Sequence, residues 1–251
     1  MSVIYFPNRV YHGNDKVPSI DRVMAKRQVR TAQGAANLAA VNLDAELTCN
    51  TQWQIDSIMF YFNNVASKDY SAHIANGVKI IANLNDYLWI VSSLVPAQRV
   101  IMDPGFYTGT ELATHLQTKL NAMPAFSTHV PTLTFTVAYN AATGIFTITP
   151  STGTLKYLSI DITQPLSIRD SIAGHLFGLT TTSAFGATIT SDTAVLGLDS
   201  EFTIISQTSS AATSYVHTGL EVLTMDQSLH LLANSGSSVS TNYMVTYEEI
   251  V

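Results

Sequence analysis

The sequence has few charged residues, a single cysteine and no long apolar run. Charged side chains make up 12% of the 251 residues, about half the usual share of a soluble domain. This shortage favours two interpretations, namely extensive burial between subunits or an exposed β-surface rich in threonine. The lone cysteine, Cys49, cannot form an internal disulfide, so we expect it to be a small buried hydrophobic residue.

Membrane and export signals are also missing from the sequence. The most apolar stretch, residues 87–91, ends at two serines and is far shorter than the roughly 18 residues that a transmembrane helix needs. Residues 1–7 have no basic segment followed by a long apolar one, so they do not resemble a secretory signal. We therefore expect a protein without a membrane span that is made without signal-directed export.

The charge that is present is unevenly distributed. Residues 1–30 contain six Lys and Arg against two Asp, a net charge of +4. Because the net charge of the whole chain is −6, residues 31–251 carry −10. We predict an N-terminal arm over residues 1–46, with a helix over 21–41 that places Arg22, Lys26 and Arg30 on one face and Arg27 beside them. This stripe could contact an acidic neighbour, another copy of the chain or nucleic acid without sequence specificity, or it could simply be a solvated helix face.

The rest of the chain has the alternating pattern of β-strands. Trp53 and Ile55 lie at odd-numbered positions, whereas Ile58 and Phe60 lie at even-numbered ones. This change in the alternation predicts a strand with a bulge near Ser57. Short strands are also predicted around 71–74, 78–82, 87–91, 98–102, 156–162, 201–206, 220–223, 228–232 and 242–250. This spacing predicts a mainly β fold, an antiparallel, jelly-roll-like β-sandwich over residues 47–251.

An α/β insertion is predicted at about residues 104–180. Thr108 and Glu111 have the spacing of a capping box, and the leucines that follow recur every four residues, which predicts a helix that stops at Pro124. A strand over 133–139, a turn that ends at Gly144 and a strand over 145–149 predict a β-hairpin. Residues 167–179 have the pattern of a short helix that ends at Gly178.

This ordered combination resembles a segment of minor capsid or penton-type virion proteins of large DNA viruses and virophages, and of some phage virion proteins. The resemblance covers less than a third of the chain, and it departs from the usual pattern at the closing Phe-Gly-Leu and in the linker 123–132. It implies a virion component without enzymatic activity. The matching positions are Pro104, Gly105, Tyr107, Thr108, Leu112, Ala113, Leu120, Phe135, Val137, Tyr139, Gly144, Phe146, Ile148 and Gly178.

No pattern of catalytic chemistry competes with this interpretation. The seven histidines are widely separated, and neither a nucleophile elbow nor a phosphate-binding loop is present, so we predict no catalytic, cofactor-binding or metal-binding residues and no enzyme activity. Phe106 and Tyr107, next to Gly105, are candidates for contacting another protein. Together with Tyr61, Tyr70, Tyr87 and Trp89 they could instead form a sugar-stacking face.

From these observations we expect a virion structural protein, a minor capsid, penton or vertex/tail-attachment component. It is expected to form homo-oligomers and to bind other capsid or tail proteins, with the basic arm as a clasp. The alternative is a receptor- or carbohydrate-binding module of a viral spike or tail fibre.

Overall fold

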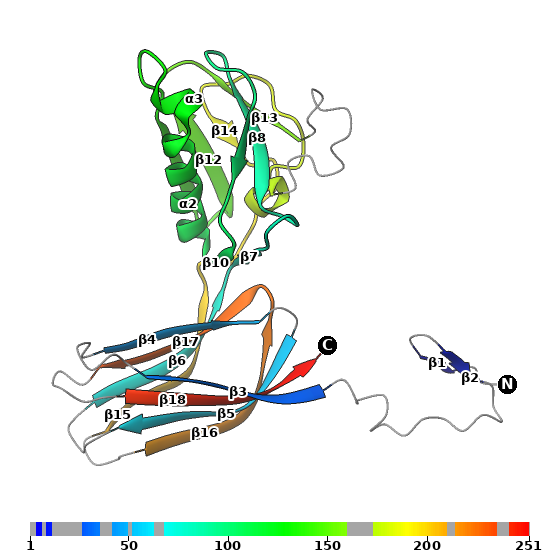
Figure 1. The fold of residues 1–251 in the computed structure, drawn as a ribbon, viewed down its shortest axis with the longest axis vertical. Coiled ribbons are helices and arrows are strands. Elements are labelled where there is room, and N and C mark those ends of the chain that lie inside the picture. Colours follow the sequence, from blue (N-terminus) through cyan, green and yellow to red (C-terminus); the bar gives the residue numbers. More distant parts are fainter. Residues whose placement is uncertain are drawn as a thin grey trace.

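The buried apolar side chains of the computed structural model form two separate cores. The structure describes residues 4–6, 9–11, 27–35, 42–49, 52–62, 68–159, 173–209, 214–234 and 241–250. One core draws on residues 43–74 and 205–245, and the other lies entirely within residues 78–198. We call the corresponding parts the sandwich lobe and the insertion lobe; Figure 1 shows the two lobes joined near β7 and β10.

The sandwich lobe contains two four-stranded antiparallel sheets whose inner faces enclose the first core. The first sheet has the order β16 (Ser214–Thr224), β5 (Gln52–Phe62), β18 (Thr241–Ile250), β3 (Arg27–Ala35). The second has the order β15 (Glu201–Ser209), β6 (Lys68–Asn76), β17 (Gln227–Asn234), β4 (Asn42–Thr48).

The strands of this lobe pair as one long hairpin that is folded over on itself. In chain order, the first strand pairs with the eighth, the second with the seventh, the third with the sixth and the fourth with the fifth. The insertion lobe connects the fourth strand, β6, to the fifth, β15, so it lies at the tip of this hairpin. Predictions of a mainly β, antiparallel fold are therefore confirmed.

Strand β5 shows the predicted change of face. Trp53 and Ile55 are buried, and so are Ile58, Phe60 and Phe62 in the other phase. The register against both neighbouring strands shifts between Ile55 and Ser57. Against β18, Asp56 is the extra residue of a bulge, whereas against β16 the residues 219 and 220 lie opposite Asp56, so the extra residue is on β16. Because the bulge resets the alternation, both halves of the strand contribute to the same core.

The insertion lobe combines helices with small antiparallel sheets. One sheet has the order β13 (Leu155–Leu158), β8 (Tyr87–Ser92), β9 (Gln98–Ile101), and the other the order β11 (Phe135–Asn140), β12 (Ile145–Pro150), β14 (Ile189–Thr190). A ribbon of β7 (Val78–Ile80) and β10 (Gly105–Tyr107) lies at its base. The helices are α2 (Gly109–Ala122), α3 (Pro124–Ser127) and the 3₁₀ helix η1 (Gly174–Phe177). Near the N-terminus, β1 (Ile4–Phe6) pairs with β2 (Arg9–Tyr11).

Helix α2 begins and packs as the sequence predicts. The Thr108 side chain accepts a hydrogen bond from the Glu111 N–H, and the Glu111 carboxylate accepts one from the Thr108 N–H, so the capping box is present. Leu112, Leu116 and Leu120 have no exposed surface and form the face that packs on the core. Burying a leucine stabilises a fold by about 1.5–3 kcal/mol, so this face provides most of the docking energy of the helix.

The predicted hairpin is also confirmed, with β11 and β12 in register from Phe135–Pro150 to Asn140–Ile145. Gly144 has a φ of 67°, which the turn requires and which a side chain would strain. Of the predicted helix 167–179, the described part holds η1, which ends at Gly178 with a φ of 63°; residues 167–172 lie outside the described residues.

Two predictions about the N-terminal part and the insertion need correction. The helix predicted over 21–41 is wrong for the described residues 27–35, which form β3 and pair with β18 along nine positions. The predicted arm 1–46 therefore includes one strand of the first sheet and most of β4 in the second. The insertion is longer than the predicted 104–180, because its core begins at Val78 and ends at Leu198.

Among the described residues, no helix is both long and apolar enough to span a membrane. Cys49 is fully buried, as predicted, and its thiol lies 3.6 Å from the carbonyl oxygen of Leu223.

Candidate functional site

The two lobes meet at a junction held mainly by backbone hydrogen bonds. The N–H of Asn76 donates to the carbonyl of Ser200 at 2.9 Å, and the N–H of Gly77 donates to the carbonyl of Asp226 at 2.9 Å. On the other side of the ribbon, the Lys79 amine donates to the Cys49 carbonyl at 2.6 Å, and burial lowers the pKa of this amine. These bonds fasten the base of the insertion lobe to the residue before β15, to the turn between β16 and β17 and to the residue after β4.

Gly77 is the closest point of this junction. A Cβ atom there would collide with the carbonyl oxygen of Tyr107 and lie 2.5 Å from the ring of Phe106. Only a glycine therefore allows β10 to approach the connection between β6 and β7 this closely.

An open groove of about 490 Å³ runs along the junction. Its apolar wall comes from the insertion lobe, with Leu176, Val195, Leu196 and Leu198. The sandwich lobe contributes Asp226 and Gln227, whose amide donates to the Asn76 side chain at 3.0 Å. Asp226 and His175 are the titratable side chains of its lining, so the groove offers no pair of carboxylates for acid–base chemistry.

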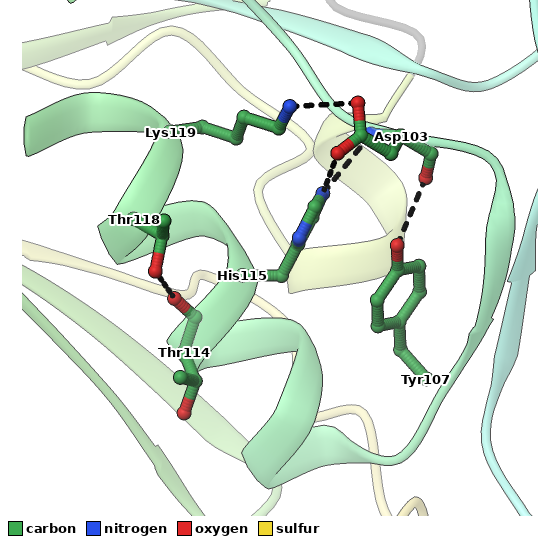
Figure 2. Close-up of polar contacts among 6 residues, drawn as sticks. All are labelled: Asp103, Tyr107, Thr114, His115, Thr118 and Lys119. Atoms are coloured by element: carbon green, nitrogen blue, oxygen red, sulfur yellow. Dashed lines mark hydrogen bonds and ion pairs between the residues drawn. The ribbon is translucent and has the colours of Figure 1, made fainter. Parts of the chain in front are cut away.

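A cluster of titratable side chains lies along one side of α2, from its middle to its last turn (Figure 2). The Lys119 amine contacts one carboxylate oxygen of Asp103 at 2.6 Å. The Nε2 atom of His115 accepts a hydrogen bond from the Asp103 N–H at 3.0 Å and lies 3.9 Å from the other carboxylate oxygen. Tyr107 stacks on the His115 ring, with 4.7 Å between the ring centroids, and its hydroxyl donates to the Asp103 carbonyl at 3.1 Å.

The electrostatics of this cluster fit a structural role. The hydrogen bond from Lys119 lowers the pKa of the Asp103 carboxyl. Burial lowers the pKa of His115 despite the nearby Asp103 carboxylate, and burial raises the pKa of the Tyr107 hydroxyl. Because its Nε2 accepts a backbone hydrogen bond, His115 is neutral and carries its proton on Nδ1. The cluster fastens α2 to the turn before β10, and none of its members lines the groove.

The predicted contact residues are distributed differently from the prediction. Arg22 and Lys26 lie outside the described residues, and Arg27 and Arg30 are in β3 at the edge of the first sheet. Because residues 27–35 form a strand, the helix on which this stripe was predicted is wrong there, and the contact role of these four basic residues stays a prediction. Phe106 and Tyr107 are half-buried in β10 and pack within the chain. Their use in contacting another protein stays a prediction.

Sequence reasoning missed the polar side chains that hold irregular segments in place. Asp192 accepts hydrogen bonds from both the N–H and the hydroxyl of Thr180 and of Thr181. These bonds, the Thr181 hydroxyl first, hold the pKa of the Asp192 carboxyl far below its usual range. The sequence signal was weak, because an aspartate and two threonines 11 and 12 residues away are ordinary loop residues.

The comparisons with known proteins provide no family for this chain. No family model matches it, and neither a curated protein nor a solved structure matches it significantly.

Proposed function

We propose that this chain is a non-enzymatic structural protein of a virion, a minor capsid, penton or vertex/tail-attachment component. In this proposal it assembles into homo-oligomers and binds other virion proteins. The basic segment within residues 1–30 contacts acidic surfaces of its neighbours.

The observation that carries the proposal is the pairing of the sandwich strands. A single hairpin folded so that the first strand pairs with the eighth and the fourth with the fifth is the strand arrangement of a jelly roll. Jelly rolls form viral capsid proteins, lectins and cupin-type enzymes. We infer that the sandwich lobe is a jelly roll, a fold that virion proteins share with lectins and cupins, and fold alone does not define function.

The filling of the sandwich argues against a cupin-type site. Such a site needs metal-binding side chains on the inner faces of the sheets. In the described part of this lobe the inner faces are apolar, with Ile55, Ile58, Phe60, Leu229 and Leu231 all at 1% exposure or below. These buried side chains provide no metal ligands.

The positions of the six predicted aromatic side chains argue against the sugar-stacking face of the alternative, a carbohydrate-binding module, although Phe185 and Phe202 are exposed elsewhere. Sugar stacking requires exposed rings, yet Tyr70 and Tyr87 are buried and Trp89 is half-buried. Of the six aromatics predicted for such a face, only Tyr61 is exposed, at 37%. The structural role in a virion is the better supported of the two.

The test is the assembly state of the full-length recombinant protein. Mass photometry and multi-angle light scattering over a concentration series, with negative-stain imaging, should reveal a closed oligomer of defined size. A protein that stays monomeric at every soluble concentration would contradict the proposal. If such a monomer bound glycans on an array, the receptor-binding alternative would replace it.

A further inference from the structure

One outer face of the sandwich lobe carries no charged side chain over a continuous area. The register of β16, β5 and β18 places nine described residues in three rows across these strands. We call these nine positions the neutral face. The rows are Ser214–Tyr61–Asn242, Val216–Met59–Met244 and Thr218–Ser57–Thr246.

The neutral face points away from the core. Every one of its nine residues is exposed or half-exposed, whereas Ile58 and Phe60, which alternate with them along β5, are fully buried. Val216 is 46% exposed, and the Tyr61 hydroxyl lies 3.3 Å from the Met59 sulfur. An apolar row of valine and two methionines therefore crosses the middle of an exposed sheet surface.

The outer face of the second sheet has the opposite character. Its register aligns Glu46, His230 and His73 across β4, β17 and β6. Asp69 and Glu201 lie on the same face, on β6 and β15. The two sheets thus differ in their solvent sides although their inner sides share one core.

We propose that the neutral face is the surface through which two copies of this chain contact each other. This inference rests on the proposed function and specifies where its self-association takes place. Outside residues 1–30 the chain carries a net charge of −10, so two copies repel each other wherever charged surfaces meet. A contact through the neutral face brings no like charges together.

The composition of the neutral face fits the core of a protein interface. Interface cores are depleted of charged residues and enriched in methionine and tyrosine, and this face presents Met59, Met244 and Tyr61. Gln54 and Glu248, which face each other beyond the bulge, belong to the polar rim.

The size of the sheet surface fits as well. The neutral face itself, three strands about 4.8 Å apart and five residues of β5 long, covers roughly 250 Å², and the whole four-stranded sheet, 11 residues long along β5, covers roughly 700 Å². The neutral face is therefore the centre of a contact that extends over the rest of the sheet. A stable interface buries about 800 Å² on each partner.

The two sheets offer a matched pair of substitutions to test this contact. Ser57 and Ser71 are both half-exposed serines on the outer sides of interior strands, one on the neutral face and one on the charged sheet. Ser57→Glu should raise the dissociation constant of the oligomer by about 100-fold or more, because like charges would face each other across the contact. Ser71→Glu should leave it unchanged.

A second variant and a stability measurement guard against misfolding. Val216→Glu adds the same charge on edge strand β16, two residues further from the bulge, and should also weaken assembly by about 100-fold. Circular dichroism and thermal unfolding, compared with the wild-type monomer, should show that all three variants are folded.

The outcomes separate the two proposals. A wild-type protein that is monomeric throughout contradicts the proposed function itself. A wild-type oligomer that survives both Ser57→Glu and Val216→Glu overturns only the assignment of the neutral face. Loss of assembly in Ser71→Glu alone also overturns it and moves the contact to the charged sheet.

Discussion

The side chain of Asn121 bonds to the exposed edge of strand β11 and offers a sharp test of how the insertion lobe is held together. Its Oδ1 accepts a hydrogen bond from the Phe135 N–H at 2.7 Å, and its Nδ2 donates to the Phe135 carbonyl at 3.1 Å. Gln117, one turn earlier, accepts from the Val137 N–H at 2.9 Å. Helix α2 thereby replaces a neighbouring strand along the edge of this sheet.

Substituting Asn121→Ala removes both bonds to Phe135. The Phe135 residue is only 3% exposed, so its N–H and carbonyl would be left in a largely dry environment. An unsatisfied buried polar group costs about 1–3 kcal/mol, so we expect a loss of about 2–6 kcal/mol for the pair. For a chain of this size that corresponds to a fall of roughly 4–24 °C in the unfolding midpoint.

Thermal unfolding, together with hydrogen exchange of the segment 133–140, measures both the energetic and the local effect. Asn121→Asp keeps an acceptor for the N–H but turns an oxygen toward the Phe135 carbonyl, so it should not restore stability. Thr118→Ala is the control, because the exposed Thr118 hydroxyl bonds only to the Thr114 carbonyl of its own helix (Figure 2). If Asn121→Ala matched this control in its unfolding midpoint and in its hydrogen exchange, the proposed role of the two Asn121 hydrogen bonds would be refuted.

Three further predictions concern pH, packing and chain length. Burial lowers the pKa of His115 below its ordinary 6.5, so the unfolded chain binds more protons and the free energy of unfolding should fall as the pH drops from 7 to 5. In urea titrations, His115→Gln should lose this pH dependence, because its Oε1 can accept the hydrogen bond from the Asp103 N–H. A wild type equally stable at both pH values would contradict this prediction. Gly77→Ala should cost about 1–3 kcal/mol in urea titrations because of overpacking at the junction, and an unchanged stability would show that the contact is not tight. Deleting residues 1–26 should leave a folded sandwich lobe. Deleting residues 1–45 removes β3 and most of β4 and exposes two sheet edges, so this variant should aggregate in size-exclusion chromatography. A monodisperse product of the longer deletion would contradict this prediction.

The features that the sequence predicted well are those specified by residues close together in the chain. The capping box needs Thr108 and Glu111 three positions apart, and the hairpin turn needs Gly144 between two alternating segments. The bulge in β5 was visible because the hydrophobic phase changes within the strand itself. Each of these signals lies within one short continuous segment of the chain, so no knowledge of a distant partner was required.

The errors arose where a distant partner decides the structure. Residues 27–35 contain alanine, arginine and glutamine, which favour helix by only a few tenths of a kcal/mol per residue. In the structure Arg27 pairs with Ile250 and Ala35 with Asn242, and the ladder of backbone bonds to β18 outweighs that local preference. The predicted strands over 78–101 were correct in type, but their alternation cannot tell which of two cores they pack on.

The contrast between local and distant contacts also bears on where the insertion lobe begins and ends. Asn76 and Ser200 are hydrogen-bonded to each other, so the chain leaves the sandwich and returns to it at one point, between two strands that would otherwise be joined by a tight turn. An insertion at such a point leaves every strand pair of the sandwich intact, and it can form its own core from a contiguous stretch of chain. Local sequence signals were therefore most informative in the insertion lobe, whereas the sandwich lobe depends on pairing its first strand with its last. The neutral face proposed for assembly also depends on distant pairing, because it is defined only by the register of β5, β16 and β18, three strands that are distant in sequence.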